Sequence, residues 1–376
     1  MRLEPRLLRG ARLPLTCVRI ILLQTLKPFP MRKLFWGLLG LLAVLIVLSL
    51  VVLRGCDRPV KVESNLYRIH RIYTGARAEV WTARFGPGDS VIAAASVDST
   101  LRVWHTDGRL LAALPAPGGL TCAEWAPDGK SIAATSYDGA VYLWSWPEGK
   151  LLQRYDTHHG TAWTLRFSPD GSLLASAGED KLVVLRRLSD GRVTARLSGH
   201  RLNIWDLSFS PDGKTLASGS FDAKVFLWDV AGARLRRSYE GHDEAVVALA
   251  FSLDGSTLAS SSDDGTVQLQ DAASGRLLQT LHTPEHQQGI AFSPDGKRLV
   301  SGGRDHNLVG ELTQNFFADK TDRPGVSMRL WNLADGRLLQ TFSGHSDDAN
   351  DVQFSRDGKW ILSAGADKIV ILWKQQ

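Results

Sequence analysis

Cysteine is scarce in this chain of 376 residues, and motifs for bound metals or nucleotides are absent. The three cysteines, Cys17, Cys56 and Cys122, lie far apart, so neither a zinc-type spacing nor a disulfide framework emerges. No Gly-x-Ser-x-Gly nucleophile motif occurs, and the Gly-Lys-Ser and Gly-Lys-Thr triplets lack the leading glycine of a phosphate loop. The sequence therefore predicts no metal, no cofactor and no small-molecule substrate.

The body of the chain also lacks excess positive charge. The formal net charge is +5, but residues 1–33 carry eight basic residues against Glu4 alone. The remaining residues hold 36 basic and 38 acidic side chains, once those are taken from the totals of 44 and 39. A nearly neutral body lacks the basic surface of a nucleic-acid-binding protein. We therefore expect no nucleic-acid partner.

One long apolar run is present, and it predicts a membrane anchor. Residues 34–53 read LFWGLLGLLAVLIVLSLVVL, without a charged side chain. As a helix, twenty residues extend about 30 Å, which matches a bilayer core. Basic residues dominate before Leu34, whereas charges after Leu53 are mixed. By the positive-inside rule, the basic segment 1–33 is cytoplasmic, while the linker 54–64 and the rest lie outside the cytoplasm of a single-pass protein.

Three alternatives to this anchor remain open in the sequence. Met31 is followed by its own basic and apolar stretch, so it is a candidate start that would make residues 1–30 an artefact. The tetrapeptide ending at Cys56 faintly resembles a lipoprotein cleavage site, although Arg54 fits that pattern poorly. The apolar run could also be a buried helix of a soluble domain, but its length and lack of charge favour the uncleaved anchor.

An internal repeat occupies most of the chain. An aspartate recurs at intervals of 40 to 42 residues, with an additional 20 residues before its last copy, at Asp98, Asp138, Asp180, Asp222, Asp264, Asp305 and Asp367. Most copies have a tryptophan six residues after the aspartate, and four copies have a histidine 22 residues before it. Ser-Pro-Asp-Gly-type turns separate short alternating runs, four in each copy. A period near 42 residues indicates a repeat architecture.

With these elements, the chain resembles the WD-repeat β-propeller family from residue 65 to residue 376. The resemblance implies an all-β propeller of seven four-stranded antiparallel blades. The last copy ends after its third strand, while residues 65–75 read as an unpaired outer strand. We therefore expect the N-terminal strand to complete the last blade, which leaves no free sheet edge.

The resemblance also implies a structural hydrogen-bond set within a blade. In two copies the family's four positions are all filled, by His200, Ser218, Asp222 and Trp228 and by His345, Ser363, Asp367 and Trp373. Although Ser, His and Asp invite a hydrolase interpretation, several buried copies favour a structural role. Four copies depart from the pattern, at Ala76, Ala116, Arg186 and Gln270, and we expect those blades to be weaker individually.

Three features predict a partner-binding face, which we call the top face. It carries the loops between the fourth and first strands and between the second and third strands. The inner strands begin with Trp81, Trp163 and Trp205 in three copies, a position near the channel mouth in similar proteins. The insertion at residues 306–325 adds apolar side chains, and the residue before the repeated aspartate varies. The further candidates from these two features are Phe316, Phe317, Tyr137, Phe221 and Arg304.

Three functional hypotheses follow. The favoured one is a membrane-tethered, non-catalytic scaffold that binds a protein or peptide through the top face. The second is an extracytoplasmic propeller enzyme, a hydrolase or lyase, which needs clustered titratable groups; Arg84, Glu124, Asp206 and Asp351 belong to different blades, and the pattern predicts no convergent set. The third is a structural member of an envelope complex, and exposed apolar outer strands would favour it.

Overall fold

A computed structural model describes residues 65–283, 286–303 and 326–376 of the chain. The predicted membrane segment, Met31 and Cys56 lie outside these residues, as do Arg304, Phe316 and Phe317. Within the described residues, no helix combines the length and apolar character needed to cross a bilayer.

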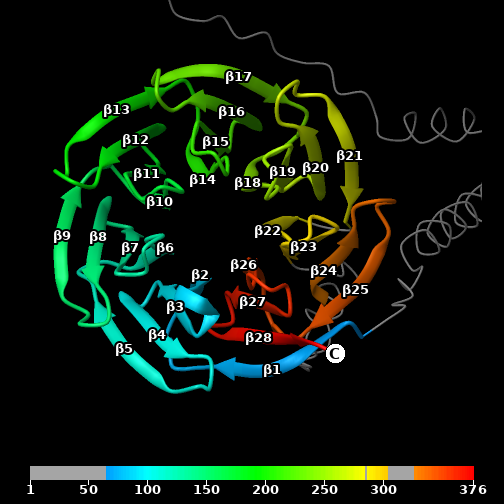
Figure 1. Ribbon diagram of the computed structural model, residues 1–376, viewed down its shortest axis with the longest axis horizontal. Helices are drawn as coiled ribbons and strands as arrows, with labels where there is room; N and C mark the ends of the chain where they lie inside the picture. Colours follow the sequence, from blue (N-terminus) through cyan, green and yellow to red (C-terminus); the bar gives the residue numbers. More distant parts are fainter. Residues whose placement is uncertain (1–64, 284–285, 304–325) are drawn as a thin grey trace, which may run out of the picture. The chain divides into compact units, whose positions relative to one another are not determined.

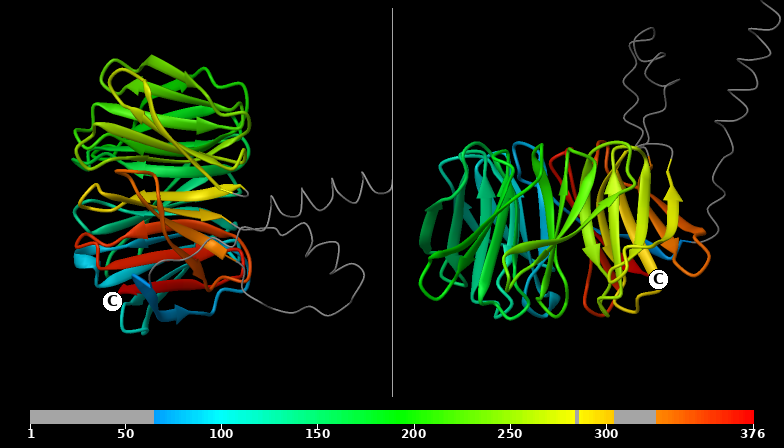
Figure 2. Two further views of the ribbon diagram at one scale, coloured as in Figure 1. Left: turned by 90° about the vertical axis from the view of Figure 1, so that its right-hand side faces the viewer. Right: turned by 90° about the horizontal axis from the view of Figure 1, so that it is seen from above.

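The described residues form seven antiparallel sheets of four strands each, arranged as blades around a central axis (Figure 1). Figure 2 shows the propeller from two sides, with the strands running between the two faces and the turns gathered on them. This arrangement confirms the predicted seven-bladed all-β fold.

Each blade follows the chain, with its first strand nearest the axis. Blade 1 contains β2 (Val80–Phe85), β3 (Val91–Ser96), β4 (Thr100–His105) and β5 (Leu110–Pro115), with the short 3-10 helix η1 (Pro87–Asp89) between its first two strands. Blade 2 contains β6 (Leu120–Trp125), β7 (Ser131–Ser136), β8 (Ala140–Ser145) and β9 (Leu151–Asp156). Blade 3 contains β10 (Ala162–Phe167), β11 (Leu173–Gly178), β12 (Leu182–Arg187) and β13 (Val193–Ser198). Blade 4 contains β14 (Ile204–Phe209), β15 (Thr215–Ser220), β16 (Lys224–Asp229) and β17 (Arg234–Glu240).

The remaining blades repeat this order. Blade 5 contains β18 (Val246–Phe251), β19 (Thr257–Ser262), β20 (Thr266–Asp271) and β21 (Leu277–His282). Blade 6 contains β22 (Gln287–Phe292), β23 (Arg298–Gly303), β24 (Val326–Asn332) and β25 (Leu338–Ser343). Blade 7 contains β26 (Ala349–Phe354), β27 (Trp360–Gly365), β28 (Val370–Gln375) and the N-terminal strand β1 (Tyr67–Tyr73).

The ring closes through β1, as the sequence predicted. This strand pairs antiparallel with β28, from Tyr67 opposite Gln375 to Tyr73 opposite Val370, beside the C-terminus (Figure 1). A side chain of the preceding blade reinforces the closure. The amide of Gln340 on β25 accepts a hydrogen bond from the Tyr67 backbone N–H at 2.8 Å and donates one to the Tyr67 carbonyl at 2.7 Å. Closure therefore joins blades 6 and 7 as well as the two ends of the chain.

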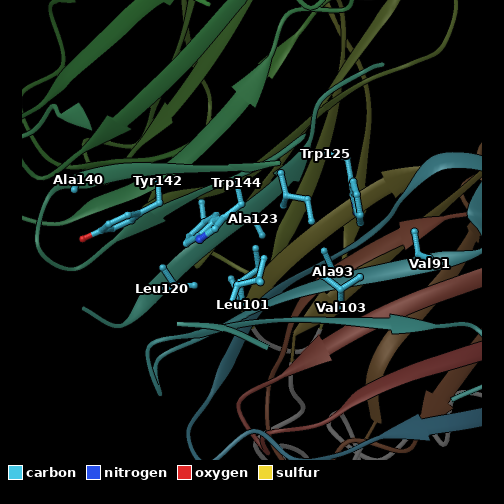
Figure 3. Close-up of a cluster of buried hydrophobic side chains, with 14 residues drawn as sticks. Val91, Ala93, Leu101, Val103, Leu120, Ala123, Trp125, Ala140, Tyr142 and Trp144 are labelled. Carbon is cyan, nitrogen blue, oxygen red and sulfur yellow. The ribbon is translucent and has the colours of Figure 1, made fainter. Parts of the chain in front are cut away.

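Apolar side chains between neighbouring blades form the core. Figure 3 shows the cluster between blades 1 and 2, where Leu101 and Val103 of β4 lie against Leu120 and Trp125 of β6 and Trp144 of β8. Burying one such large side chain stabilises the fold by about 1.5–3 kcal/mol. The second strand of each blade is buried along most of its length, which explains its Ala-rich and Ser-rich sequence. Each blade thus depends on its neighbours for a hydrophobic core.

The outer strands expose apolar side chains. Leucine pairs at the start of β5, β9 and β21 are exposed, with Leu110 reaching 55% and Leu277 reaching 50%. These pairs recur at the same position of the repeat, so they are a property of the repeat rather than of one side of the ring. Exposed apolar outer strands are the feature that favours lateral contacts in an envelope complex. The exposed leucine pairs provide that feature, but they do not single out one side of the ring.

Candidate functional site

Five of the predicted partner-binding residues meet in one aromatic cluster on the top face. They are Trp81, Tyr137, Trp163, Trp205 and Phe221, from blades 1 to 4. The Trp163 and Trp205 rings stack with centroids 4.4 Å apart, and Phe221 stacks on Trp205 at 5.0 Å. Trp81 meets both other indoles edge-on, at 6.2 and 5.8 Å. The structure therefore brings residues from four separate repeats into a single surface feature.

The cluster is half-buried and lies outside the cores between blades. Tyr137 is 38% exposed, and the other four rings have intermediate exposure. The Trp81 indole donates a hydrogen bond to the Tyr137 hydroxyl at 3.1 Å, whereas the buried indole N–H of Trp163 has no partner among the described residues. The tryptophans thus pack on one another at the channel mouth. Large half-buried aromatic side chains of this kind are typical of protein-binding hot spots.

A cavity of about 350 Å³ borders the aromatic cluster. Trp81, Trp205 and Phe221 line one part of it. Of the described residues, four acidic ones also line it, without a lysine or arginine among them: Glu79, Asp263, Asp347 and Asp348. Aromatic rings and carboxylates therefore line the same cavity.

Below the aromatic cluster, charged side chains converge inside the channel, and the prediction of no convergent set is wrong. Arg84 forms ion pairs with Asp351 and, at 3.4 Å, with Glu124. Arg166 pairs with Asp206 at 2.8 Å and approaches Glu124 at 3.9 Å. The single sequence could not reveal this network because equivalent positions of different blades are neighbours only once the ring has closed.

The network is paired internally and cross-links blades. The Asp351 carboxylate also accepts a hydrogen bond from the Ala83 backbone N–H at 3.0 Å, and the Asp206 carboxylate accepts one from Leu249 at 2.8 Å. Burial raises the pKa of Asp351, although the nearby guanidinium of Arg84 opposes that shift. These contacts engage both carboxylate oxygens of Asp206 and Oδ2 of Asp351, atoms that an acid or base catalyst would present to a substrate.

The guanidinium groups remain charged despite their burial. Burial is the largest single effect on Arg84 and lowers its pKa, but the neighbouring carboxylates of Asp351 and Glu124, together with Cys122, outweigh it and raise that pKa. Burial lowers the pKa of Arg166 as well, but Asp206, with Cys122, Glu124 and Asp351, raises it overall. The adjacent Cys122 is buried, and burial raises the pKa of its thiol, which disfavours the reactive thiolate.

The family-type hydrogen-bond sets are assembled in blades 4 and 7. In blade 4, both carboxylate oxygens of Asp222 lie within 3.1 Å of His200 Nδ1, and His200 Nε2 lies 2.8 Å from Ser218 Oγ. The Trp228 indole donates to Ser218 Oγ at 2.8 Å. In blade 7, the same contacts measure 2.7 to 3.1 Å and connect His345, Ser363, Asp367 and Trp373. The serines are fully buried, so neither is available as a nucleophile.

In blades 1 and 2, which lack the histidine, other side chains pair with the repeated aspartate, and the sequence analysis missed them. In blade 1, Arg102 forms an ion pair with Asp98 at 2.8 Å. In blade 2, the Tyr142 hydroxyl donates to Asp138 at 2.6 Å, and Arg154 lies 3.5 Å from the same carboxylate. Arg102 and Tyr142 both occur four residues after the aspartate. This shared position could have revealed the substitute partners in the sequence, because a polar side chain there can pair with the aspartate in place of the missing histidine.

The model of the WD domain with the G-beta repeat matches seven segments of the chain, which together cover more than half of it. The matched segments are residues 68–105, 108–145, 149–185, 191–229, 233–271, 275–309 and 336–374. The chain belongs to the WD-repeat family. Five matches begin near the outer strand of one blade and end on the third strand of the next. The first match begins on β1 and ends on β4, so the sequence repeat and the blade are offset by one strand.

Several characterised WD-repeat proteins match shorter stretches. The chain is 32% identical to Protein HIR1 of Candida albicans over 98 residues, and 36% identical to the Lissencephaly-1 homolog of Dictyostelium discoideum over 76 residues. It is 32% identical to the human Intraflagellar transport protein 122 homolog over 84 residues. These matches cover 20–23% of this chain and only 5–17% of the relatives. WD-repeat propellers generally bind protein partners and are typically non-catalytic.

Proposed function

We propose that this WD-repeat protein is a membrane-tethered, non-catalytic scaffold that captures a protein or peptide partner through its top face. The observation that carries the proposal is the aromatic cluster of Trp81, Tyr137, Trp163, Trp205 and Phe221 at the channel mouth. The propeller is cross-linked from blade to blade, so it presents these rings on a rigid platform. A preorganised aromatic surface loses little conformational entropy on binding.

The proposed membrane anchor is argued from the sequence. The uncharged run from Leu34 to Leu53 supports a single span, and the charge asymmetry supports a propeller outside the cytoplasm. Protease accessibility in intact and opened cells tests the orientation. The proposal expects the propeller of intact cells to be cleaved only by protease added from the extracytoplasmic side; protection that ends when the cytoplasm is opened contradicts it.

Cross-linking in native membranes, followed by mass spectrometry, tests partner capture. Tyr137→Ala and Phe221→Ala remove rings at the edge of the cluster, and the double variant is expected to lose cross-linked partners. Leu253→Ala is the matched control, because Leu253 is an apolar side chain with 70% exposure in the turn between β18 and β19, on the opposite face. Unchanged capture by the double variant refutes the top-face proposal.

The alternative of an enzyme at the channel mouth has less support. Its best candidates are Glu124, Asp206 and Asp351, and the last two already pair with arginine and backbone N–H groups. Turnover of a hydrolase or lyase substrate that is lost in Glu124→Gln would favour this alternative. The scaffold proposal expects that variant to retain partner capture.

A further inference from the structure

The outside of blade 7, where the ring closes, presents basic side chains. On β1, Arg68 and His70 are exposed and Arg71 is half-buried, and on β28 Lys374 is exposed. Arg68 and Lys374 lie directly opposite each other in the antiparallel pair. Neither β1 nor β28 contains an acidic residue. Like charges in direct opposition destabilise a pair of strands, so this arrangement favours the approach of an anion.

The positive charge extends across both strands. Lys374 Nζ lies 5.3 Å from the centre of the Trp360 ring, and His70 meets the same ring edge-on at 4.9 Å. Burial lowers the pKa of His70, and the charges of Arg71 and Lys374 lower it further. The pKa of His70 therefore reports a positive potential on the outside of blade 7.

Acidic residues on the turns of blades 1 and 7 have basic partners of their own. Asp107 pairs with Arg109 at 2.9 Å. Asp357 lies 3.6 Å from Lys359. These carboxylates are thus shared with other cations, and the basic side chains of β1 and β28 keep an excess of positive charge.

Exposed isoleucines lie between the basic residues on β1. Ile69 is 43% exposed and Ile72 is 47% exposed. Surfaces that combine basic and apolar side chains suit the interface of an anionic bilayer, where phosphate groups meet the acyl chains. A soluble anion would pair with the basic residues but leave the isoleucines in water. We call this combined surface the closure surface; it consists of Arg68, Ile69, His70, Arg71, Ile72 and Lys374.

The chain itself brings the closure surface to a bilayer. The predicted span ends at Leu53 and β1 begins at Tyr67, so residues 54–66, thirteen in all, separate them. Thirteen extended residues reach at most about 45 Å. The outer strand of blade 4, β17, also carries exposed arginines, but it contains Glu240 and lies across the ring from β1 (Figure 1). Of these two basic outer strands, β1 is the one that follows the proposed anchor in the chain.

We propose that the closure surface lies on the membrane and binds anionic phospholipids. Arg68, Arg71 and Lys374 contact the phosphate groups, while Ile69 and Ile72 enter the interfacial region. Because β1 lies on the rim of the propeller, this contact leaves the top face accessible to a partner. The inference rests on the proposed membrane anchor.

The test uses the full-length chain in nanodiscs of phosphatidylcholine, with or without about one-third phosphatidylglycerol. The fluorophore NBD, which emits more strongly in an apolar environment, is attached to Ile72→Cys on β1 or to Leu235→Cys on β17, which is 46% exposed. Cys17 and Cys56 are replaced by serine, and Cys122 is buried. The Ile72→Cys label should emit about twofold more strongly with the anionic lipid, whereas the Leu235→Cys label should change little. An equal or larger response from Leu235→Cys, or none from Ile72→Cys, overturns the proposal.

Two double variants locate the contact. Arg68→Gln/Lys374→Gln removes the opposed pair and should weaken docking about tenfold, without lowering the melting temperature, because like-charge repulsion is also removed. Arg234→Gln/Arg236→Gln is the matched control, since it removes two exposed arginines of β17 and should leave the response unchanged. Equal losses in the two double variants, or no loss in either, overturn the assignment.

Salt provides a check that needs no substitution of a basic residue. Raising the salt concentration from about 0.1 to 1 M shortens the Debye length from about 10 to 3 Å and should abolish the response of the Ile72→Cys label. A response that persists overturns the electrostatic basis of the proposal.

Alkaline carbonate extraction separates this inference from the proposed anchor. A chain that stays in the membrane but shows no response to anionic lipid keeps the anchor and refutes the inference. A chain that carbonate releases refutes the anchor, and the inference falls with it. Loss of the native cross-linked partner in Arg68→Gln/Lys374→Gln, without a lipid response, assigns the closure surface to an acidic protein surface and overturns the proposal.

Discussion

The hydrogen-bond sets allow a stability prediction that compares blades within one molecule. Ser218 in blade 4 connects two buried groups, His200 and Trp228. Among the described residues, the Ser176 hydroxyl in blade 3 hydrogen-bonds to the side chain of His158 alone, because Arg186 replaces the tryptophan. Ser218→Ala should therefore destabilise the protein more than Ser176→Ala, although both substitutions remove one buried hydroxyl.

The magnitude follows from the number of groups left without a partner. The carboxylate of Asp222 fixes the proton on His200 Nδ1, so Nε2 accepts from Ser218, whose oxygen accepts from Trp228. Each buried polar group left unpaired costs about 1–3 kcal/mol. Ser218→Ala leaves two such groups unpaired and should lower the free energy of unfolding by about 2–6 kcal/mol, whereas Ser176→Ala leaves one unpaired and should cost about 1–3 kcal/mol.

Equilibrium urea unfolding, followed by tryptophan fluorescence and far-UV circular dichroism, measures the difference. Coincident transitions from the two probes establish that one free energy describes unfolding. Ser363→Ala repeats the test in blade 7, where Trp373 donates to the serine, and should resemble Ser218→Ala. Ser260→Ala repeats the control in blade 5, where Gln270 replaces the tryptophan. Equal losses in all four variants would refute the reasoning, since the indole contact would then contribute nothing.

Three further predictions address the channel, the closure and the response to acid. Asp351→Asn leaves the buried Arg84 with its main counter-charge removed and should cost about 3–5 kcal/mol in urea unfolding, while the Arg84→Met/Asp351→Leu double variant should cost less than Asp351→Asn alone. Gln340→Ala leaves the buried backbone N–H and carbonyl of Tyr67 unpaired, and limited proteolysis should then cleave β1 faster than in the unsubstituted protein. Burial raises the pKa of Asp222, but hydrogen bonds from His200 and the backbone outweigh it and hold the pKa below its ordinary value. The resulting stabilisation is complete above the unfolded pKa of about 4 and is lost as pH falls through the folded value, so Asp222→Asn should flatten the loss of stability below about pH 4 in acid titration.

The repeat predicts the fold because each of its elements acts locally. The Asp222 turn illustrates this: Ala223 adopts a positive φ of 63°, and the turn closes through a hydrogen bond from its N–H to the Ser220 carbonyl at 3.2 Å. Such a reversal needs only a few consecutive residues, so the sequence reveals it. Blade number and closure follow from counting the reversals and noticing the missing outer strand at the C-terminus.

The central channel could not be predicted in the same way. Arg84 and Asp351 are 267 residues apart and belong to blades 1 and 7, which become neighbours only when the ring closes. Their ion pair depends on the rotation between blades and on side-chain length, neither of which a spacing of 42 residues encodes. The same reason explains why the three tryptophans could be placed at the mouth but their stacking could not be foreseen.

The proposed function depends on positions whose residue type differs between the blades. The residues that vary little between repeats, such as Ser218 and Trp228, are buried and form hydrogen bonds within their blade. The inner-strand start tolerates tryptophan, threonine, valine, glutamine or asparagine, because its side chain projects toward the channel mouth rather than into a blade. Trp163 and Trp205 therefore add nothing to the blade pattern, yet they stack on each other, and Trp205 lines the cavity beside the aromatic cluster. Side chains at the channel mouth can therefore vary without weakening the blades, and such variation can provide specificity for one partner.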